Sequence, residues 1–298
     1  MRVTQGMISD NNLRHLSSSY SKLNTYMEQL NTGKKVSKPS DDPVVVMKGM
    51  NYRSEVNRIN QYKRNTGEVH NWMDNTDSAL DKTTQALQKL RELAVQASND
   101  SYSEKERENI MEEAKQLKEH LTDIANTKVN DKYIFNGSNT SERPIKPGED
   151  GELEINFATS EVRIEVAAGT ELKANVNPEN VFGSGDDDNN VFNDIDKLIK
   201  ALDEDNQADI SASIEDLDHH IDNVINTRAD LGARMNRLEL IEDRLEDQEI
   251  VATKIMSENE DIEYEKVITD LITQESIHRA ALAAGSRMIQ PSLMDFLR

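Results

Sequence analysis

The N-terminal thirty residues carry apolar side chains at alternating intervals of three and four residues. The positions are Leu13, Leu16, Tyr20, Leu23, Met27 and Leu30. This spacing places the six side chains on one face of a helix, and such a narrow apolar face is stabilised only when a partner covers it. We therefore expect a helix from about Ser9 to Asn31, ended by Gly33 because glycine accepts the left-handed conformation after a helix.

A second apolar helical pattern occupies the last forty residues, and we expect the final helix to span about 265–288. Its alanines would let another helix approach closely. The apolar positions that we expect to make contacts are Leu282, Met288, Leu293, Phe296 and Leu297. Two such ends on one chain predict that the terminal helices pair with each other and then with neighbouring molecules.

Polar linkers separate these terminal helices from the rest of the chain. The first spans residues 34–43 and ends in Ser-Asp-Asp-Pro, which is an N-cap followed by proline in the first turn of a helix. We expect a hinge at this linker, and its residues are Pro39, Asp41, Asp42 and Pro43. The second linker is expected over 257–265, where Glu and Asp are dense and the apolar pattern weakens.

The chain between the linkers predicts long helices that pack against one another. The first is expected over about 44–98, with apolar and small residues at intervals of four and three from Val69 to Ala97. A capping-box sequence at Ser103 starts the next helix, and further helices are expected over 191–202 and from 210 onward. We expect their apolar faces to form an intramolecular core, because long single helices are stable only against partners.

The periodicity changes from helical to strand-like between the two helical halves. Residues 153–157 and 162–166 alternate apolar and polar side chains, which predicts a hairpin across the Ala-Thr-Ser-Glu segment between them. We expect a small β domain over 138–189. The helical rod domain would then comprise 43–137 and 190–258, and the terminal coiled-coil domain 1–42 and 259–298. The predicted fold is mainly α: an elongated rod of long antiparallel coiled-coil-like helices with a small inserted β domain.

The composition agrees with long thin helices and excludes several functions. Only 36% of the residues are hydrophobic, 4% are aromatic, and the net charge is -21, which disfavours contact with nucleic acid or anionic membranes. The chain has no cysteine and no apolar run long enough to span a membrane. Residues 1–64 hold 11 of the 35 basic and 5 of the 56 acidic residues. This asymmetry either steers head-to-body contacts between molecules or is a chance feature of a solvated surface.

Candidate chemistry in the sequence is weak. His219 and His220 lie among aspartates, but adjacent helical residues point about 100° apart, so we interpret them as a solvated helix face. The acidic loop that ends at Asn190 begins like a calcium loop, but Val191 replaces the required glycine and Lys197 the required glutamate. We predict no catalytic, cofactor-binding or metal site, and no enzymatic activity.

Four local sequences resemble the flagellin superfamily of flagellar axial proteins, and within it the hook-associated protein 3 group, which forms the hook–filament junction. They are Met1–Met7, Leu30–Pro43, Asn226–Leu238 and Pro291–Arg298. The resemblance covers both helical thirds of the chain. Flagellins usually follow the Asp-Asp pair with small residues, whereas this chain has Pro43 there. This departure favours a junction protein over a filament subunit.

The resemblance implies a function and its partners. The chain would join hook to filament, with terminal helices that are unfolded in the monomer and fold as a coiled coil in the inner tube. It would leave the cell through the flagellar type III apparatus without a cleavable signal peptide. Expected partners are identical copies in a ring, hook-associated protein 1, flagellin, and an export chaperone on the C-terminal helix. Two alternatives remain: a filament-forming flagellin, and a non-flagellar cytoplasmic coiled-coil adaptor.

Overall fold

The computed structural model describes residues 5–99, 104–148, 153–185 and 190–288. The chain forms two compact units. We call the one made from residues 1–58 and 248–298 the terminal unit, and the one made from 59–247 the central unit. The units meet in sequence within two long helices rather than at the polar linkers, so each of these helices contributes residues to both units.

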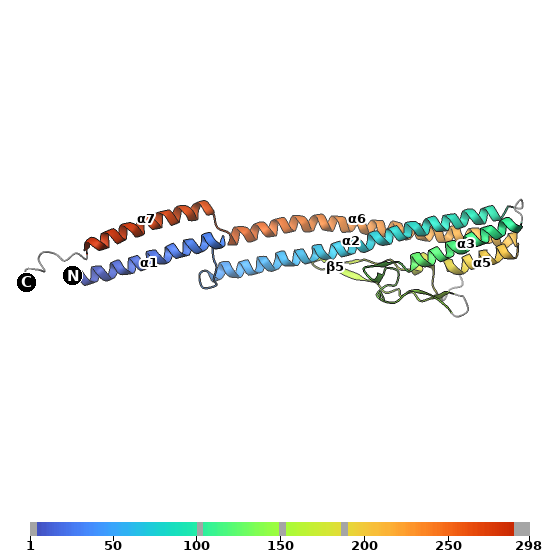
Figure 1. Cartoon of the computed structure of the whole chain (residues 1–298), viewed down its shortest axis with the longest axis horizontal. Coiled ribbons are helices and arrows are strands. Elements are labelled where there is room, and N and C mark those ends of the chain that lie inside the picture. The colour runs from blue at the N-terminus through green and yellow to red at the C-terminus, as the bar shows by residue number, and fades with distance from the viewer. Residues whose placement is uncertain (1–4, 100–103, 149–152, 186–189, 289–298) are drawn as a thin grey trace, which may run out of the picture. The chain divides into compact units, whose positions relative to one another are not determined.

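Helices make up most of the described residues (Figure 1), which confirms the mainly α prediction. Their bounds are α1 Gln5–Thr32, α2 Pro43–Ala97, α3 Glu104–Ala125, α4 Glu179–Phe182, α5 Val191–Asp203, α6 Gln207–Glu260 and α7 Tyr264–Met288. The second linker is shorter than expected, because α6 continues through the acidic stretch to Glu260. The amide of Asp261 still donates to the carbonyl of Ser257, so only about one turn interrupts the helices.

The predicted repeat on α2 forms the core of the central unit. Its members from Val69 to Ala97 are all buried: Val69, Met73, Thr76, Leu80, Thr83, Leu87, Leu90, Ala94 and Ala97. The two threonine hydroxyls donate to backbone carbonyls one turn earlier, so their burial leaves no hydroxyl unsatisfied. On α6, the buried side chains include Leu217, Val224, Leu231 and Leu238, as the apolar repeat predicts.

Ion pairs fix the antiparallel register of α2 and α6 inside the central unit. Arg228 of α6 binds Asp77 at 2.7 Å and Asp81 at 2.6 Å. Farther along α2, Arg91 binds Asp218, an earlier residue of α6. As the α2 number rises, the α6 number falls, which is the antiparallel arrangement expected. The partners are about one third to one half exposed, so each pair contributes little to stability and serves mainly to set alignment.

The β region differs from its predicted pairing. Its strands are β1 Lys128–Val129, β2 Lys132–Tyr133, β3 Ile145–Pro147, β4 Leu153–Ile155, β5 Arg163–Ala167 and β6 Thr170–Lys173. They form three two-stranded antiparallel ladders, β1–β2, β3–β4 and β5–β6. The expected hairpin between 153–157 and 162–166 is therefore wrong. Buried Asn136 and Asn175 bond the chain between these segments and leave it without strand pairing.

Phenylalanines join the β region to the neighbouring helices. The Phe182 ring of α4 lies 5.4 Å from Phe135, 5.8 Å from Phe157 and 5.9 Å from Phe192, measured between centroids. Phe135, Phe182 and Phe192 are fully buried. These separations are within the range of favourable aromatic contacts. The cluster gives the small inserted ladders an apolar core that they cannot form alone.

The histidine pair of α6 does not form the solvated face that we expected. His219 is exposed, but His220 is buried and its Nε2 lies 2.7 Å from a carboxylate oxygen of buried Asp194. Lys197, one turn along α5, binds the other oxygen at 2.8 Å. Burial raises the pKa of Asp194, but hydrogen bonds from His220 and Lys197 outweigh it and hold that pKa below its ordinary value. The expectation was wrong because the partner aspartate lies on another helix.

Candidate assembly surfaces of the terminal helices

The terminal unit places α1 alongside α7 (Figure 1). On α1 the half-buried and buried positions follow intervals of three and four: Ser9, Asn12, Leu16, Ser19, Leu23, Tyr26 and Leu30. On α7 the corresponding positions are Val267, Leu271, Gln274, His278, Ala281 and Gly285. The Gln274 amide donates to the Ser19 hydroxyl at 2.8 Å. We call this α7-facing set of α1 positions the inner face.

The six-residue apolar stripe predicted on α1 divides between two directions. Leu16, Leu23 and Leu30 belong to the inner face and are half-buried. The other three residues stand seven apart and remain exposed: Leu13 is 62%, Tyr20 60% and Met27 54% accessible. We call these three residues the outer stripe. The intermolecular seam that we expected from all six residues is thus split, because the α7 pairing uses half of it.

The C-terminal helix also exposes apolar side chains. Ile268, Ile272, Ile277 and Leu282 of α7 are all exposed, so the predicted contact residue Leu282 lies on the surface of the terminal unit. Met288 is the last residue of α7. Leu293, Phe296 and Leu297 lie outside the described residues. The surface offered by the described part of α7 is therefore apolar over much of its length.

The expected hinge residues form capped turns. The Asp42 carboxylate accepts the amides of Val44 at 2.9 Å and Val45 at 3.1 Å, while Pro43 opens α2. Asp42 is therefore the N-cap that the sequence indicated. Asp41 closes the preceding turn, with its carboxylate accepting the amide of Lys38 at 3.1 Å. Pro39 is exposed in that turn.

The two linkers pair with each other through their backbones. The amide of Lys35 donates to the carbonyl of Glu260 at 2.6 Å, and the amide of Ile262 donates to the carbonyl of Gly33 at 3.1 Å. Gly33 has a φ of 68°, and a Cβ there would lie 2.9 Å from the Tyr264 hydroxyl. Glycine therefore permits both the helix end and the close approach of the second linker.

Charged side chains reinforce this backbone pairing. The buried carboxylate of Glu260 is bound by Arg53 and by Lys34 at 3.2 Å, and Lys34 also binds Asp261 at 2.6 Å. Gly49 of α2 leaves room for the Glu260 carboxylate, since a Cβ at this position would be 2.5 Å from a Glu260 oxygen. We call the set Gly33, Lys34, Lys35, Arg53, Glu260, Asp261 and Ile262 the linker clasp.

The linker clasp shifts the titration of both acidic groups. Burial raises the pKa of Glu260, but hydrogen bonds from Arg53 and Lys34 outweigh it and hold the pKa below its ordinary value. The Lys34 ammonium and then the Ser257 hydroxyl lower the pKa of Asp261. Our sequence reasoning missed this cluster. The signal available was a Lys-Lys pair in one linker and a Glu-Asp pair in the other.

Residues 3–140 match the family model described as the bacterial flagellin N-terminal helical region. The chain is therefore similar to the flagellin superfamily in its N-terminal sequence and in its fold. It is 27% identical to flagellar hook-associated protein 3 of Escherichia coli K12, in an alignment that covers 99% of each protein. It is 25% identical to the flagellin of Bacillus subtilis 168, with complete coverage of both. The chain also shares the fold of hook associated protein-3 from Legionella pneumophila, with a TM-score of 0.62, 17% identity, and coverage of 70% of this chain and 97% of that one.

The described residues contain few other candidate sites. Within those ranges, no three histidine, aspartate or glutamate side chains are grouped so that they could hold a metal ion. None of the helices in the described part combines the length and apolarity that crossing a membrane requires. The terminal helices and their clasp are therefore the features to which a function attaches most directly.

Proposed function

We propose that this protein is a structural, non-enzymatic component of the bacterial flagellum that joins the hook to the filament. Support comes from its full-length similarity to a curated hook-associated protein 3 and from the exposed apolar surface of its terminal helices. The similarity identifies the kind of structure in which the chain works. The exposed apolar surface supports a contact between one copy and the next.

The outer stripe of α1 is the observation on which the assembly mechanism rests. Leu13, Tyr20 and Met27 form an apolar line at heptad spacing, next to an inner face that α7 already covers. Complete burial of a side chain of this size contributes about 1.5–3 kcal/mol. Repeated around a ring, this gain stabilises contacts between copies and offsets the entropy of ordering the terminal helices.

The wider set of partners follows from the same role. Identical copies form the ring, hook-associated protein 1 binds on one side and flagellin on the other. An export chaperone covers the C-terminal helix before secretion, and the protein reaches the cell exterior through the flagellar export apparatus. Helices α1 and α7 become ordered only on assembly, whereas the linker clasp is present before it. The residues proposed for assembly include the outer stripe, Leu282, Met288, Leu293, Phe296 and Leu297.

A filament-forming flagellin is the second candidate function. The Bacillus subtilis flagellin aligns over the whole of this chain at nearly the same identity as the hook-associated protein does. Seeded polymerisation separates the two roles. A flagellin added to filament seeds extends them into long filaments, whereas a junction protein does not elongate them.

The experiment for the assembly role changes the outer stripe in cells that lack their own copy. The double substitution Leu13→Asp and Met27→Asp is expected to yield secreted protein but no attached filaments, since each aspartate would be desolvated at the interface. Ser18→Asp is the control, because Ser18 is an exposed α1 residue on a different side of the helix from the outer stripe. Normal filaments with the double variant would contradict the proposed contact.

A further inference from the structure

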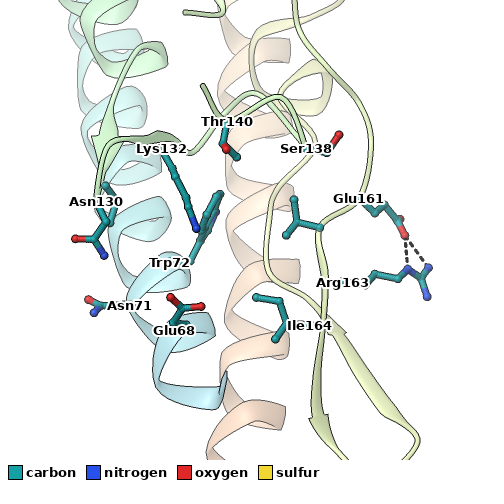
Figure 2. Close-up of a pocket in the computed structure, with 12 residues that line it drawn as sticks. Glu68, Asn71, Trp72, Asn130, Lys132, Ser138, Thr140, Glu161, Arg163 and Ile164 are labelled. Atoms are coloured by element: carbon teal, nitrogen blue, oxygen red, sulfur yellow. Dashed lines mark hydrogen bonds and ion pairs between the residues drawn. The ribbon is translucent and has the colours of Figure 1, made fainter. Parts of the chain in front are cut away.

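A cavity of about 430 Å³ lies in the central unit, and all of its lining residues belong to that unit. Its walls come from α2, from the β1–β2 turn, from residues 138–140 and from residues 161–164 (Figure 2). In Figure 2, Glu68, Asn71 and Trp72 of α2 form one side, and Glu161, Arg163 and Ile164 the other. The volume falls within the usual range for small-molecule sites.

Buried asparagines hold the walls of this cavity. The Asn175 side chain accepts the amide of Val162 at 2.9 Å and donates to the carbonyl of Ser160 at 3.0 Å. Asn136 accepts the amide of Ala158 at 2.9 Å. Both asparagines are essentially inaccessible, so the wall at 158–162 is fixed by satisfied buried hydrogen bonds. The cavity is pre-formed rather than a gap between mobile loops.

The opposite rim is set by a tight turn. Asn130 and Asp131 join β1 to β2 with φ values of 49° and 62°. Two successive positive φ values characterise the type I′ turn of two-residue hairpins. The turn presents Val129, Asn130 and Lys132 to the cavity. Across it, the Asn65 side chain donates to the Glu165 carbonyl at 2.7 Å and keeps β5 close to α2.

The cavity lining combines an apolar floor with polar groups whose charges sum to zero. Trp72, Val129, Val162 and Ile164 supply the apolar surface, and Glu68, Asn71, Asn130, Lys132, Thr140, Glu161 and Arg163 supply polar groups. The two acidic groups balance the two basic ones, and Glu161 and Arg163 already bind each other. The buried indole Nε1 of Trp72 has no hydrogen-bond partner among the described residues.

We propose that this cavity binds a neutral saccharide ring, stacked on the apolar floor around Trp72. A pyranose has a C–H face that packs on an indole and hydroxyls at its edge that match amides, a threonine hydroxyl and a carboxylate. An isolated phosphate would meet Glu68 and Glu161 as well as the cations. A wholly apolar ligand would desolvate the charged rim without compensation. This inference goes beyond the flagellar role and does not depend on it.

The single tryptophan of the chain makes the proposal directly testable. Trp72 emission is recorded while purified full-length protein is titrated with D-glucose, D-galactose or N-acetyl-D-glucosamine up to tens of millimolar. We expect a saturable change for at least one sugar, with a Kd in the millimolar range. Sodium phosphate and glycine at equal concentrations serve as ligands of the wrong chemistry.

Matched variants localise the response to the cavity. Glu68→Ala and Asn71→Ala change exposed rim residues and should weaken the apparent affinity at least tenfold while the far-UV circular dichroism is unchanged. Lys82→Ala, an exposed substitution farther along α2, should bind as the unmodified protein does. The proposal is overturned if no sugar gives a saturable change, if phosphate or glycine gives it instead, or if both rim variants keep full affinity.

Discussion

Arg53 donates two hydrogen bonds to the buried carboxylate of Glu260, with Nε 2.8 Å from Oε1 and Nη2 2.6 Å from Oε2. The two residues are 207 positions apart in sequence and join the start of α2 to the end of α6 within the terminal unit. Bidentate guanidinium–carboxylate pairs are both directional and strong. The pair therefore determines where the second linker meets the first.

Removing the Glu260 charge should loosen the linker clasp. In Glu260→Gln, Arg53 and Lys34 lose their shared anion, and we expect a loss of about 1–3 kcal/mol because the carboxylate is buried while Arg53 is largely exposed. Faster proteolysis within residues 33–42 measures the effect. Glu258→Gln removes an equal charge from an exposed neighbour and is the control. Equal proteolysis rates for the two variants would contradict a structural role for the clasp.

Lowering the pH should weaken the linker clasp. Both Glu260 and Asp261 have a pKa below their ordinary values of 4.5 and 3.8. Their stabilisation is thus fully present above about pH 4.5 and is lost as the pH falls through the lowered values. Hydrogen-exchange protection of the Lys35 and Ile262 amides, corrected for intrinsic rates, should decline in that acidic window. Protection that stays constant down to pH 2.5 would contradict this account.

Substitution by alanine should raise thermal stability at one glycine of α2 but not at another. Alanine is preferred to glycine inside a helix by about 1 kcal/mol. Nothing lies within 4 Å of a Cβ at Gly67, so Gly67→Ala should raise the thermal midpoint. At Gly49 the Cβ would meet the Glu260 carboxylate. Gly49→Ala should therefore displace the carboxylate that Arg53 binds, and the thermal midpoint should not rise. A stabilisation by Gly49→Ala equal to that of Gly67→Ala would show that the close approach is unimportant.

The two adjacent histidines of α6, of which only His220 is buried, offer a matched comparison in the central unit. His220→Ala leaves the buried Asp194 carboxylate with Lys197 alone, and we expect a loss of about 2–4 kcal/mol in denaturant unfolding. His219→Ala changes an exposed neighbour and should cost less than about 0.5 kcal/mol. Comparable losses for the two variants would mean that the Asp194 contact does not stabilise the fold.

The helical architecture could be predicted because its signal is long and periodic. The repeat from Val69 to Ala97 continues over many turns, so chance cannot imitate it, and the helix bounds fall within a few residues of expectation. The β-strands are only two to five residues long. Their alternation of apolar and polar side chains does not specify which strand pairs with which. Asn136 and Asn175 decide the pairing through side-chain bonds to the backbone, which no apolar pattern reveals.

The candidate assembly surface was only partly predictable for a related reason. The six α1 positions were predicted as one contact surface from their apolar character alone. The side of α1 that faces α7 also includes polar Ser19 and half-buried Tyr26. Which apolar residues remain outside is decided by the helix that packs beside α1. The linker clasp escaped prediction because the charged pairs in the two linkers do not specify which distant residues they contact.

The central claim is that this chain occupies the hook–filament junction through the outer stripe of α1. Immunogold labelling of flagella isolated from cells carrying the unmodified protein tests it most directly. We predict label confined to the boundary between hook and filament, and none there for Leu13→Asp with Met27→Asp. Label distributed along the filament, or protein retained only inside the cell, would contradict the account.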